Sequence, residues 1–152
     1  MSTKTVDTAT QTEVVVLPVG RDRYAVPIEW VREVVAAPAV TPLVTAGPPV
    51  LGLLNLRGEI VPLFDTAALL GVGTIGAPQY AAVLLTPLGS AGLAATGLPH
   101  RALLDSPAAP SELPGTAGLH HVQGHPTVLL DPEVLLVPER LGAPADLPSV
   151  GF

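Results

Sequence analysis

Residues 52–70 read GLLNLRGEIVPLFDTAALL, and residues 118–136 read GLHHVQGHPTVLLDPEVLL. Placed over each other without a gap, at a shift of 66 positions, the two stretches agree in glycines, an acid and leucines. The agreeing positions are Gly52 and Gly118, Gly58 and Gly124, Leu63 and Leu129, Asp65 and Asp131, Leu69 and Leu135, and Leu70 and Leu136. This period is too long for a solenoid repeat and indicates a duplicated small subdomain. Each half alone is too small for a stable core, so we expect the halves to share one.

Each copy of the repeat predicts a β-hairpin followed by a short helix. Gly58 and Gly124 stand between two apolar runs, where glycine supplies the positive φ that a tight hairpin turn needs. Asp65 and Asp131 follow the second run, and aspartate is a strong helix N-cap. Pro132 would occupy the first helical position, where its missing N–H costs nothing. We therefore interpret both acids as caps, and not as catalytic groups.

Composition favours an all-β domain. The chain has 152 residues, of which 15 are glycine and 18 are proline, so few stretches are long enough for a helix of more than about ten residues. Short apolar runs with turn signals between them are typical of a barrel or a sandwich. The length limits the chain to one domain or two small, intimately packed ones.

Charge and cysteine content exclude several kinds of partner. The net charge is −6 with only seven Lys and Arg, scattered singly, so no basic surface for nucleic acid or anionic lipid is expected. No cysteine is present, which excludes disulfides and thiolate metal sites. The chain contains neither a secretory signal nor an apolar stretch approaching the roughly 20 residues of a membrane span. We expect a cytoplasmic protein without membrane insertion and without a cofactor.

The pattern of breakers divides the chain into two halves with polar or proline-rich flanks. We expect a disordered leader, a domain with two halves joined by a small linker, and a tail: residues 1–12, 13–138 (halves 13–72 and 79–138) and 139–152. A strand is predicted over 14–19, and a second over 24–28 that continues to residue 35. In that extension Val31, Glu33 and Val35 would share one face. Strands over 80–86 and 91–96 and a loop over 105–118 precede the second hairpin.

These residues carry a family resemblance. The order YAVPI, WVREV, TPL and GLLNLRGEIVPLFD resembles the CheW-like family of chemotaxis coupling proteins, and the motif Asn55-Leu56-Arg57-Gly58 is intact. The resemblance covers residues 13–137, strongly up to residue 71. It implies two interlocked, five-stranded SH3-like barrels with short helices. It also implies a non-enzymatic adaptor that joins the tips of methyl-accepting chemotaxis receptors to the regulatory domain of a CheA-type histidine kinase.

The resemblance also implies a receptor-binding site. In the family, the valine and glutamate of the V-x-E-V element line a groove for the receptor's helical tip, and they match Val31 and Glu33. The motif arginine lies nearby and commonly pairs with that glutamate, and it matches Arg57. A shallow apolar patch rimmed by one pair of opposite charges suits an amphipathic helix. The alternatives are a solvated hairpin arginine and an ordinary strand-edge acid.

The second half departs from the family pattern. Ala95-Thr96 stands where many members carry Val-Asp, and the following GLPHRALLDSPAAP is short of charge. In the family the second barrel contributes to contacts with the kinase. The alternative function is therefore a divergent β-barrel module that binds a peptide or a small ligand without contacting a kinase.

Catalytic and metal-binding patterns are weak. His120, His121 and His125 suggest a metal site, but adjacent histidines on a strand point to opposite faces, so we expect an exposed hairpin and no metal. No G-x-S-x-G motif is present to make a serine nucleophilic. The segment GVGTIG at 71–76 mimics a dinucleotide-binding loop but follows a predicted helix, so we interpret it as a flexible linker. A histidine-dependent metalloenzyme ranks last among the functions.

Overall fold

A computed structural model describes residues 12–43, 49–105 and 109–137 of the chain. Of the predicted leader only Thr12 is described, and it begins the first strand; the predicted tail lies outside the described residues. The strands are β1 (Thr12–Val19), β2 (Asp22–Pro27), β3 (Val31–Ala36), β4 (Val40–Thr41), β5 (Val50–Leu56), β6 (Glu59–Phe64), β7 (Tyr80–Thr86), β8 (Gly89–Ala95), β9 (His100–Leu104), β10 (Thr116–Val122) and β11 (His125–Leu130). The helical elements are the 3-10 helix η1 (Ile28–Trp30) and the helices α2 (Thr66–Leu70) and α3 (Pro132–Leu135).

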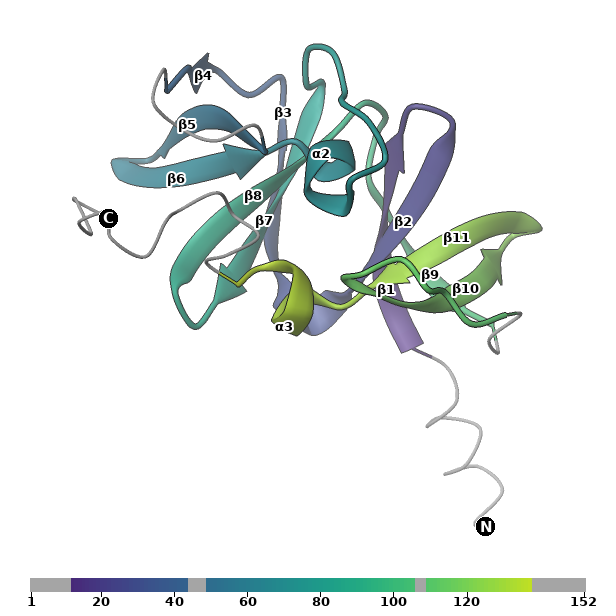
Figure 1. Cartoon of the computed structure of the whole chain (residues 1–152). Helices are drawn as coiled ribbons and strands as arrows, with labels where there is room; N and C mark the ends of the chain where they lie inside the picture. The colour runs from purple at the N-terminus through teal and green to yellow at the C-terminus, as the bar shows by residue number, and fades with distance from the viewer. Residues whose placement is uncertain (1–11, 44–48, 106–108, 138–152) are drawn as a thin grey trace, which may run out of the picture.

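The strands form two sheets that exchange elements between the halves (Figure 1). The first sheet has the order β3-β7-β8-β6-β5-β4, and the second has the order β10-β11-β2-β1-β9. Each sheet therefore combines the repeated hairpin of one half with the leading hairpin of the other. The predicted all-β fold with interlocked halves is confirmed, and the second sheet has the expected five strands, whereas the two-residue strand β4 gives the first sheet six.

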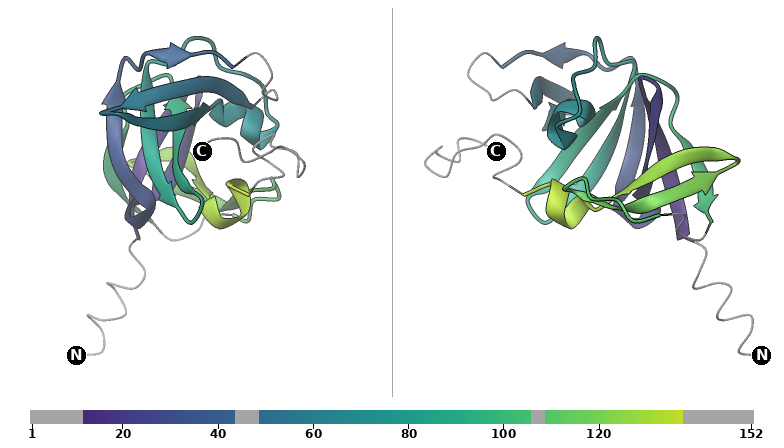
Figure 2. Two further views of the ribbon diagram at one scale, coloured as in Figure 1. Left: turned by 90° about the vertical axis from the view of Figure 1, so that its left-hand side faces the viewer. Right: turned by 45° about the vertical axis from the view of Figure 1, so that its right-hand side comes forward.

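Equivalent parallel pairings join the halves. Strand β6 pairs with β8 through Leu63 and Gly92, and β11 pairs with β2 through Leu129 and Ala25. All other strand pairs are antiparallel within the described residues. The right-hand view in Figure 2 shows the green β10–β11 hairpin of the second sheet on the side of the molecule away from the blue-teal β5–β6 hairpin of the first sheet. The two sheets are therefore related in the same way as the two repeated hairpins.

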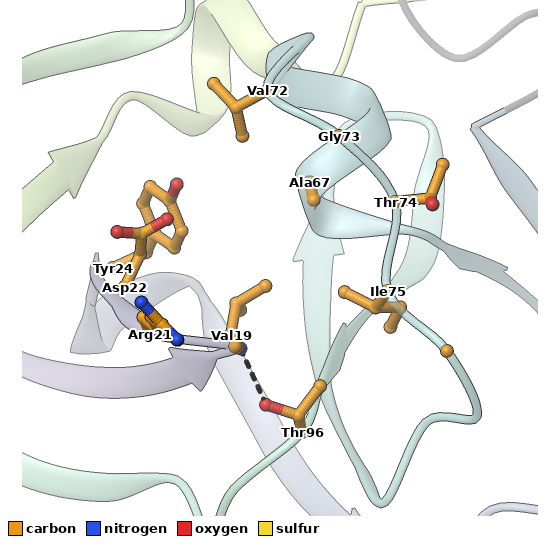
Figure 3. A pocket seen from close by; sticks show the side chains of 12 residues that line it. Val19, Arg21, Asp22, Tyr24, Ala67, Val72, Gly73, Thr74, Ile75 and Thr96 are labelled. Atoms are coloured by element: carbon orange, nitrogen blue, oxygen red, sulfur yellow. Dashed lines mark hydrogen bonds between the residues drawn. The ribbon is translucent and has the colours of Figure 1, made fainter.

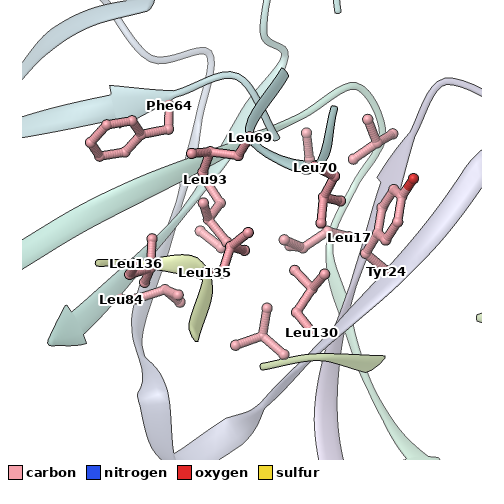
Figure 4. Close-up of a cluster of buried hydrophobic side chains, with 14 of the residues drawn as sticks. Leu17, Tyr24, Phe64, Leu69, Leu70, Leu84, Leu93, Leu130, Leu135 and Leu136 are labelled. Carbon is pink, nitrogen blue, oxygen red and sulfur yellow. The ribbon is translucent and has the colours of Figure 1, made fainter. Parts of the chain in front are cut away.

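The apolar core has three parts, and the largest is shared by both halves. That shared cluster combines residues from β1, β2, β6, β7, β8 and β11 with both α2 and α3 (Figure 4). Among its fully buried members are Leu17, Leu84, Leu93, Leu130 and Leu135. A smaller cluster lies within each sheet, around Val61 and Leu63 in the first and around Val14 and Val16 in the second. Each of these smaller clusters also combines residues of both halves. The expectation that the two halves share their core is therefore confirmed.

The two repeated hairpins have the same backbone. Arg57 and Gly58 have φ values of 53° and 91°, and the equivalent Gln123 and Gly124 have 51° and 80°. Two consecutive positive φ values define a type I′ turn, the connection that matches the twist of antiparallel strands. The predicted turns at Gly58 and Gly124 are confirmed. Both hairpins also carry a register shift at the same place, at Val50/Gly52 and at Thr116/Gly118.

The two helix caps differ, contrary to the prediction that both acids cap with their side chains. The Asp65 carboxylate accepts the Ala68 N–H at 3.0 Å and, with its other oxygen, the Ile75 N–H at 3.0 Å. Asp131 also precedes a helix, but its side chain accepts no capping hydrogen bond. The backbone φ is −111° at Asp131 and −75° at Asp65, so the chain leads into the two helices with different backbone conformations. Pro132 does occupy the first turn, as predicted.

The chain between β2 and β3 also departs from the prediction. Strand β2 ends at Pro27, which cannot donate to a ladder, and η1 then redirects the chain so that β3 joins the other sheet. Within β3 a bulge separates Val31 from Glu33. Because a bulge interrupts side-chain alternation, Val31 packs against the shared core whereas Val35 packs against the cluster of the first sheet. The expected single face of Val31, Glu33 and Val35 is therefore wrong.

Candidate functional site

The NLRG motif builds a hairpin tip that projects one arginine. Leu56 is 8% exposed and belongs to the cluster of the first sheet, and it pairs across the strands with Glu59. The Asn55 side-chain oxygen accepts the Gly58 N–H at 2.8 Å, which holds the turn from inside. With Leu56 directed inward and the turn closed by Asn55 and Gly58, Arg57 points to solvent, and its side chain is 66% exposed.

Glu33 on β3 meets this arginine. The Arg57 Nη1 and Nη2 atoms donate to Glu33 Oε1 and Oε2 at 3.1 Å and 2.6 Å. This two-bond fork fixes the relative orientation of both side chains, which a single contact does not. The Glu33 side chain is 25% exposed, so the acid lies at the edge of the sheet with the arginine over it. The structure thus brings together Glu33 and Arg57, two of the three predicted receptor-binding residues.

Three further residues, which the sequence reasoning missed, extend the pair. Arg32 Nη1 donates to Glu59 Oε1 at 2.7 Å and to Ser90 Oγ at 2.9 Å. Arg32 Nε also lies 3.4 Å from Glu33 Oε2. We call Arg32, Glu33, Arg57 and Glu59 the charge ring, because positive and negative charges alternate around it. The sequence signal was present, since Arg32-Glu33 and Arg57-x-Glu59 each place a cation before an acid on segments that face each other.

The charge ring changes the acidity of its carboxyls. The hydrogen bonds from Arg57 hold the pKa of Glu33 below its ordinary value, and the charges of Arg57 and Arg32 act in the same direction. The hydrogen bond from Arg32 likewise lowers the pKa of Glu59. The Arg57 pKa is raised by its bonds to Glu33. Both acids of the ring are therefore anionic over the whole neutral range.

Val31, the third predicted site residue, lies beside the charge ring and not on it. It is half-buried against the shared core and pairs with Leu84 on β7. The preceding Trp30 lines a shallow groove of about 230 Å³, together with residues of the β7–β8 turn and of α3. The lining residues are Trp30, Thr86, Pro87, Leu88, Pro132, Glu133, Leu136 and Val137. Trp30 is thus a groove-wall residue that also packs on the core.

The groove and the charge ring are adjacent. Ser90, which accepts from Arg32, pairs across the β7–β8 hairpin with Leu85, and Leu88 stands at the tip of that hairpin. Leu85 and Leu88 on this hairpin are 61% and 67% exposed, so they add apolar surface beside the groove. Apolar surface rimmed by a charged cluster is typical of a site for another protein.

A second cavity lies elsewhere in the molecule, between β2 and α2. It measures about 380 Å³, and Tyr24, Ala67, Val72, Ile75 and Thr96 are among its lining residues (Figure 3). Burial and the nearby charge of Asp22 raise the pKa of the Tyr24 hydroxyl. Residues 72–76 of the glycine-rich segment 71–76 form one wall, but the segment follows a helix and leads to a strand, the reverse of a dinucleotide-binding loop. Ile75 anchors this segment through its backbone bond to Asp65 and its packing on two clusters.

The histidines of the second hairpin are separated. His120 is buried, contrary to the expected exposure, and its Nδ1 lies 2.8 Å from the carbonyl oxygen of Asp105. His121 and His125 are exposed, so the prediction that adjacent histidines face opposite ways is confirmed. Within residues 12–43, 49–105 and 109–137, no three side chains of His, Asp or Glu come together as metal ligands would. Nor do those ranges contain a helix long and apolar enough to cross a membrane.

The fold and the site together define a double-sheet β domain with interlocked halves and an exposed ring of charges. A family model described as a CheW-like domain matches residues 13–139 of the sequence, and the chain therefore belongs to the CheW-like domain family.

Individual relatives agree with this assignment. The chain is 38% identical over 60 residues to the chemotaxis protein CheW of Rhizobium meliloti (strain 1021), a match that covers 40% of this chain and 39% of that relative. It is also similar to the crystal structure of the scaffolding protein TtCheW from Thermoanaerobacter tengcongensis. That similarity has a TM-score of 0.65 at 20% identity and covers 78% of this chain and 88% of the other. At this identity the likeness supports the fold.

Proposed function

We propose that this chain is a non-enzymatic cytoplasmic adaptor that couples chemoreceptors to a CheA-type histidine kinase, in chemotaxis or a related chemosensory pathway. The observation that carries the proposal is the two-bond pair of Glu33 and Arg57 at an exposed hairpin tip, next to an apolar groove. Family membership and the printed names of the two relatives support it.

The proposed receptor site suits an amphipathic helix. Such a helix places its apolar stripe in a groove and its flanking charges on the rim. Here Trp30, Leu88 and Leu136 offer the apolar surface, and Arg57 offers the rim charge. Arginine has five N–H donors, and Glu33 occupies two of those on Arg57, so the others remain for a carboxylate or carbonyl of the partner. Val31, the residue after Trp30, packs against the shared core beside the groove, as Trp30 does.

An adaptor needs a second surface for its second partner. The second sheet offers one, because Leu103 on β9 and the nearby Leu98 are 52% and 63% exposed. Leu103 belongs to a different sheet from the charge ring, and Leu98 lies in the segment that leads into β9, so a receptor tip on the ring would leave both accessible. We assign this surface to the regulatory domain of the kinase.

The decisive experiment reverses one charge. Arg57→Glu sets an acid beside Glu33 and Glu59, so like charges would face the partner helix. We expect the affinity for a recombinant methyl-accepting receptor tip to fall at least about tenfold, because like charges placed together at an interface make the binding free energy less favourable. The melting temperature should change little, since exposed ion pairs contribute little to folding. Calorimetric titration and thermal unfolding measure the two effects.

The matched control is Gln123→Glu, at the equivalent turn position of the second hairpin. It adds an acid to the same type of turn but far from the ring in sequence, and it should leave receptor-tip binding unchanged. The exchange Glu33→Arg with Arg57→Glu should recover part of the loss. If folded Arg57→Glu binds the tip as the unaltered chain does, the site is wrong. If Arg57→Glu unfolds the chain, Arg57 is a structural residue.

The cavity between β2 and α2 favours a second candidate function. Its volume of about 380 Å³ falls within the roughly 300–1,000 Å³ of small-ligand sites, and its walls combine apolar side chains with the polar Arg21, Asp22 and Thr96. A ligand-binding regulatory module without kinase contact would use this cavity and not the ring. Failure of the unaltered chain to bind both a receptor tip and a CheA-type regulatory domain would favour this alternative over the adaptor.

A further inference from the structure

Arg32 occupies a special place on its strand. The ladder between β3 and β7 pairs Val31 with Leu84 and then Glu33 with Val83, so Arg32 is the extra residue of a bulge. A bulge re-aims a side chain relative to the regular pleat. The Arg32 guanidinium thereby reaches three groups from three segments of the first sheet. These are Glu33 on β3, Glu59 on β6 and Ser90 on β8.

The charge ring joins segments that the backbone does not join. In the first sheet, β3 is separated from β6 by β7 and β8, and no ladder connects it to the β5–β6 hairpin. The connection between β3 and the hairpin tip is made by two ion pairs, Arg57 with Glu33 and Arg32 with Glu59. Because Arg57 and Glu59 flank Gly58, both pairs hold the same turn.

Glu33 is held from both sides in this arrangement. Arg57 donates to both of its carboxylate oxygens, and Arg32 Nε approaches Oε2 from the strand. The Arg32 side chain is less exposed than that of Arg57, at 29% against 66%. Arg32 is therefore placed to hold the Glu33 carboxylate in position. Glu33 in turn holds the guanidinium of Arg57.

We propose that Arg32 is a positioning residue for partner binding: it holds Glu33 in place and so orients the exposed Arg57 toward a partner helix. This inference rests on the proposed function for its partner, but the orientation itself is a property of the free chain. A long side chain ordered before binding loses less conformational entropy when the complex forms. The planar fork of arginine is required, because lysine offers one ammonium and does not reproduce contacts to three groups.

The test compares Arg32→Gln with Arg101→Gln. Arg101 forms an exposed ion pair with Glu13 on the second sheet, so its loss removes a similar contact away from the ring. Nitrogen-15 relaxation and exchange of the Arg57 guanidinium report its order in the free protein. We expect Arg32→Gln to release Arg57, and Arg101→Gln to leave it ordered. We expect the receptor-tip Kd to rise about threefold to tenfold for Arg32→Gln, mainly through faster dissociation.

Two more variants separate positioning from folding. Arg32→Lys keeps the charge and should restore the melting temperature but not the order of Arg57. Glu59→Gln keeps Arg32 but weakens its ion pair with Glu59, so it should lower the order of the Arg57 guanidinium in part. This variant still tests the proposal if Arg32→Gln does not fold. An Arg57 guanidinium that stays ordered in Arg32→Gln or Glu59→Gln would overturn the proposal, as would unchanged tip affinity once Arg57 is released. If the unaltered chain binds no receptor tip, the proposed function fails, while the order of Arg57 still decides the role of Arg32.

Discussion

The two repeated units, residues 52–70 and 118–136, share their backbone and differ in their side chains. Both have a type I′ turn and a bulge at an equivalent glycine. In both, the backbone N–H of the acid after the hairpin donates to a carbonyl oxygen just before the hairpin, Asp65 to Pro49 and Asp131 to Gly115. Only the first carries charges at the turn that meet a neighbouring strand. The fold thus depends on the shared backbone geometry, and the candidate site on side chains that one unit has and the other lacks.

The largest expected effect separates the two bulge glycines. At Gly52, φ is +154°, and an added Cβ would clash with the Thr41 carbonyl oxygen and lie 2.7 Å from Val40 Cγ1, because β4 crosses there. At Gly118, φ is +137°, and the nearest atom to an added Cβ is 3.6 Å away. Gly52→Ala should therefore cost about 3 kcal/mol through strain and overpacking together, and Gly118→Ala about 1 kcal/mol through strain alone. Urea denaturation measures the free energy of unfolding of both variants. Equal decreases would show that β4 leaves room for a Cβ at residue 52.

A smaller effect separates the two acids. Asp65 is 2% exposed and accepts two backbone N–H groups, from Ala68 and from Ile75. Asp65→Ala should cost about 2 kcal/mol, because a cap is lost and a second buried donor is left without its acceptor. Asp131→Ala should cost less than about 0.5 kcal/mol, since its side chain makes no capping bond. Thermal unfolding of the two variants gives the difference, and a costlier Asp131→Ala would contradict this account of the caps.

The comparison also shows what the sequence predicts and what it does not. Glycine spacing and the acid after each hairpin predict both hairpins, both helices and the shared core, because they follow from local backbone conformation and from the repeat. The strands β4 and β9 were missed, since β4 has two residues and β9 lies among breakers within GLPHRALLDSP. Tertiary context decides these strands, and no local signal predicts them.

The candidate site was predicted in part for a similar reason. The pairing of Glu33 with Arg57 came from the family resemblance, and the structure has it at 2.6 Å. The contact of Arg32 with Glu33 was not predicted, because adjacent residues of a regular strand point to opposite faces. The bulge at Arg32 places the two side chains close together. Glu59 was missed because its partner comes from a strand that is distant in sequence. Long-range side-chain contacts of this kind depend on the exact path of the backbone.

The smallest effect concerns pH and tests the charge ring without a partner. The pKa of Glu33 and of Glu59 lies below the ordinary value of 4.5, chiefly through hydrogen bonds from Arg57 and Arg32 respectively. Because the folded-state pKa is the lower one, the stabilising effect of the ring is complete above the ordinary value and is lost as pH falls through the folded-state pKa. Both carboxyls lie at the surface, Glu33 half-buried and Glu59 exposed, where solvent screens their charges, so the effect on unfolding should be slight. Carbon-13 titration of the glutamate carboxyls measures the pKa of each residue separately.

Arg57→Gln should raise the Glu33 pKa toward 4.5, whereas Arg101→Gln on the other sheet should leave it unchanged. A Glu33 that titrates identically in all three proteins would mean that the two-bond pair does not persist in solution, and the first unit would then lack the Glu33–Arg57 contact that distinguishes it from the second.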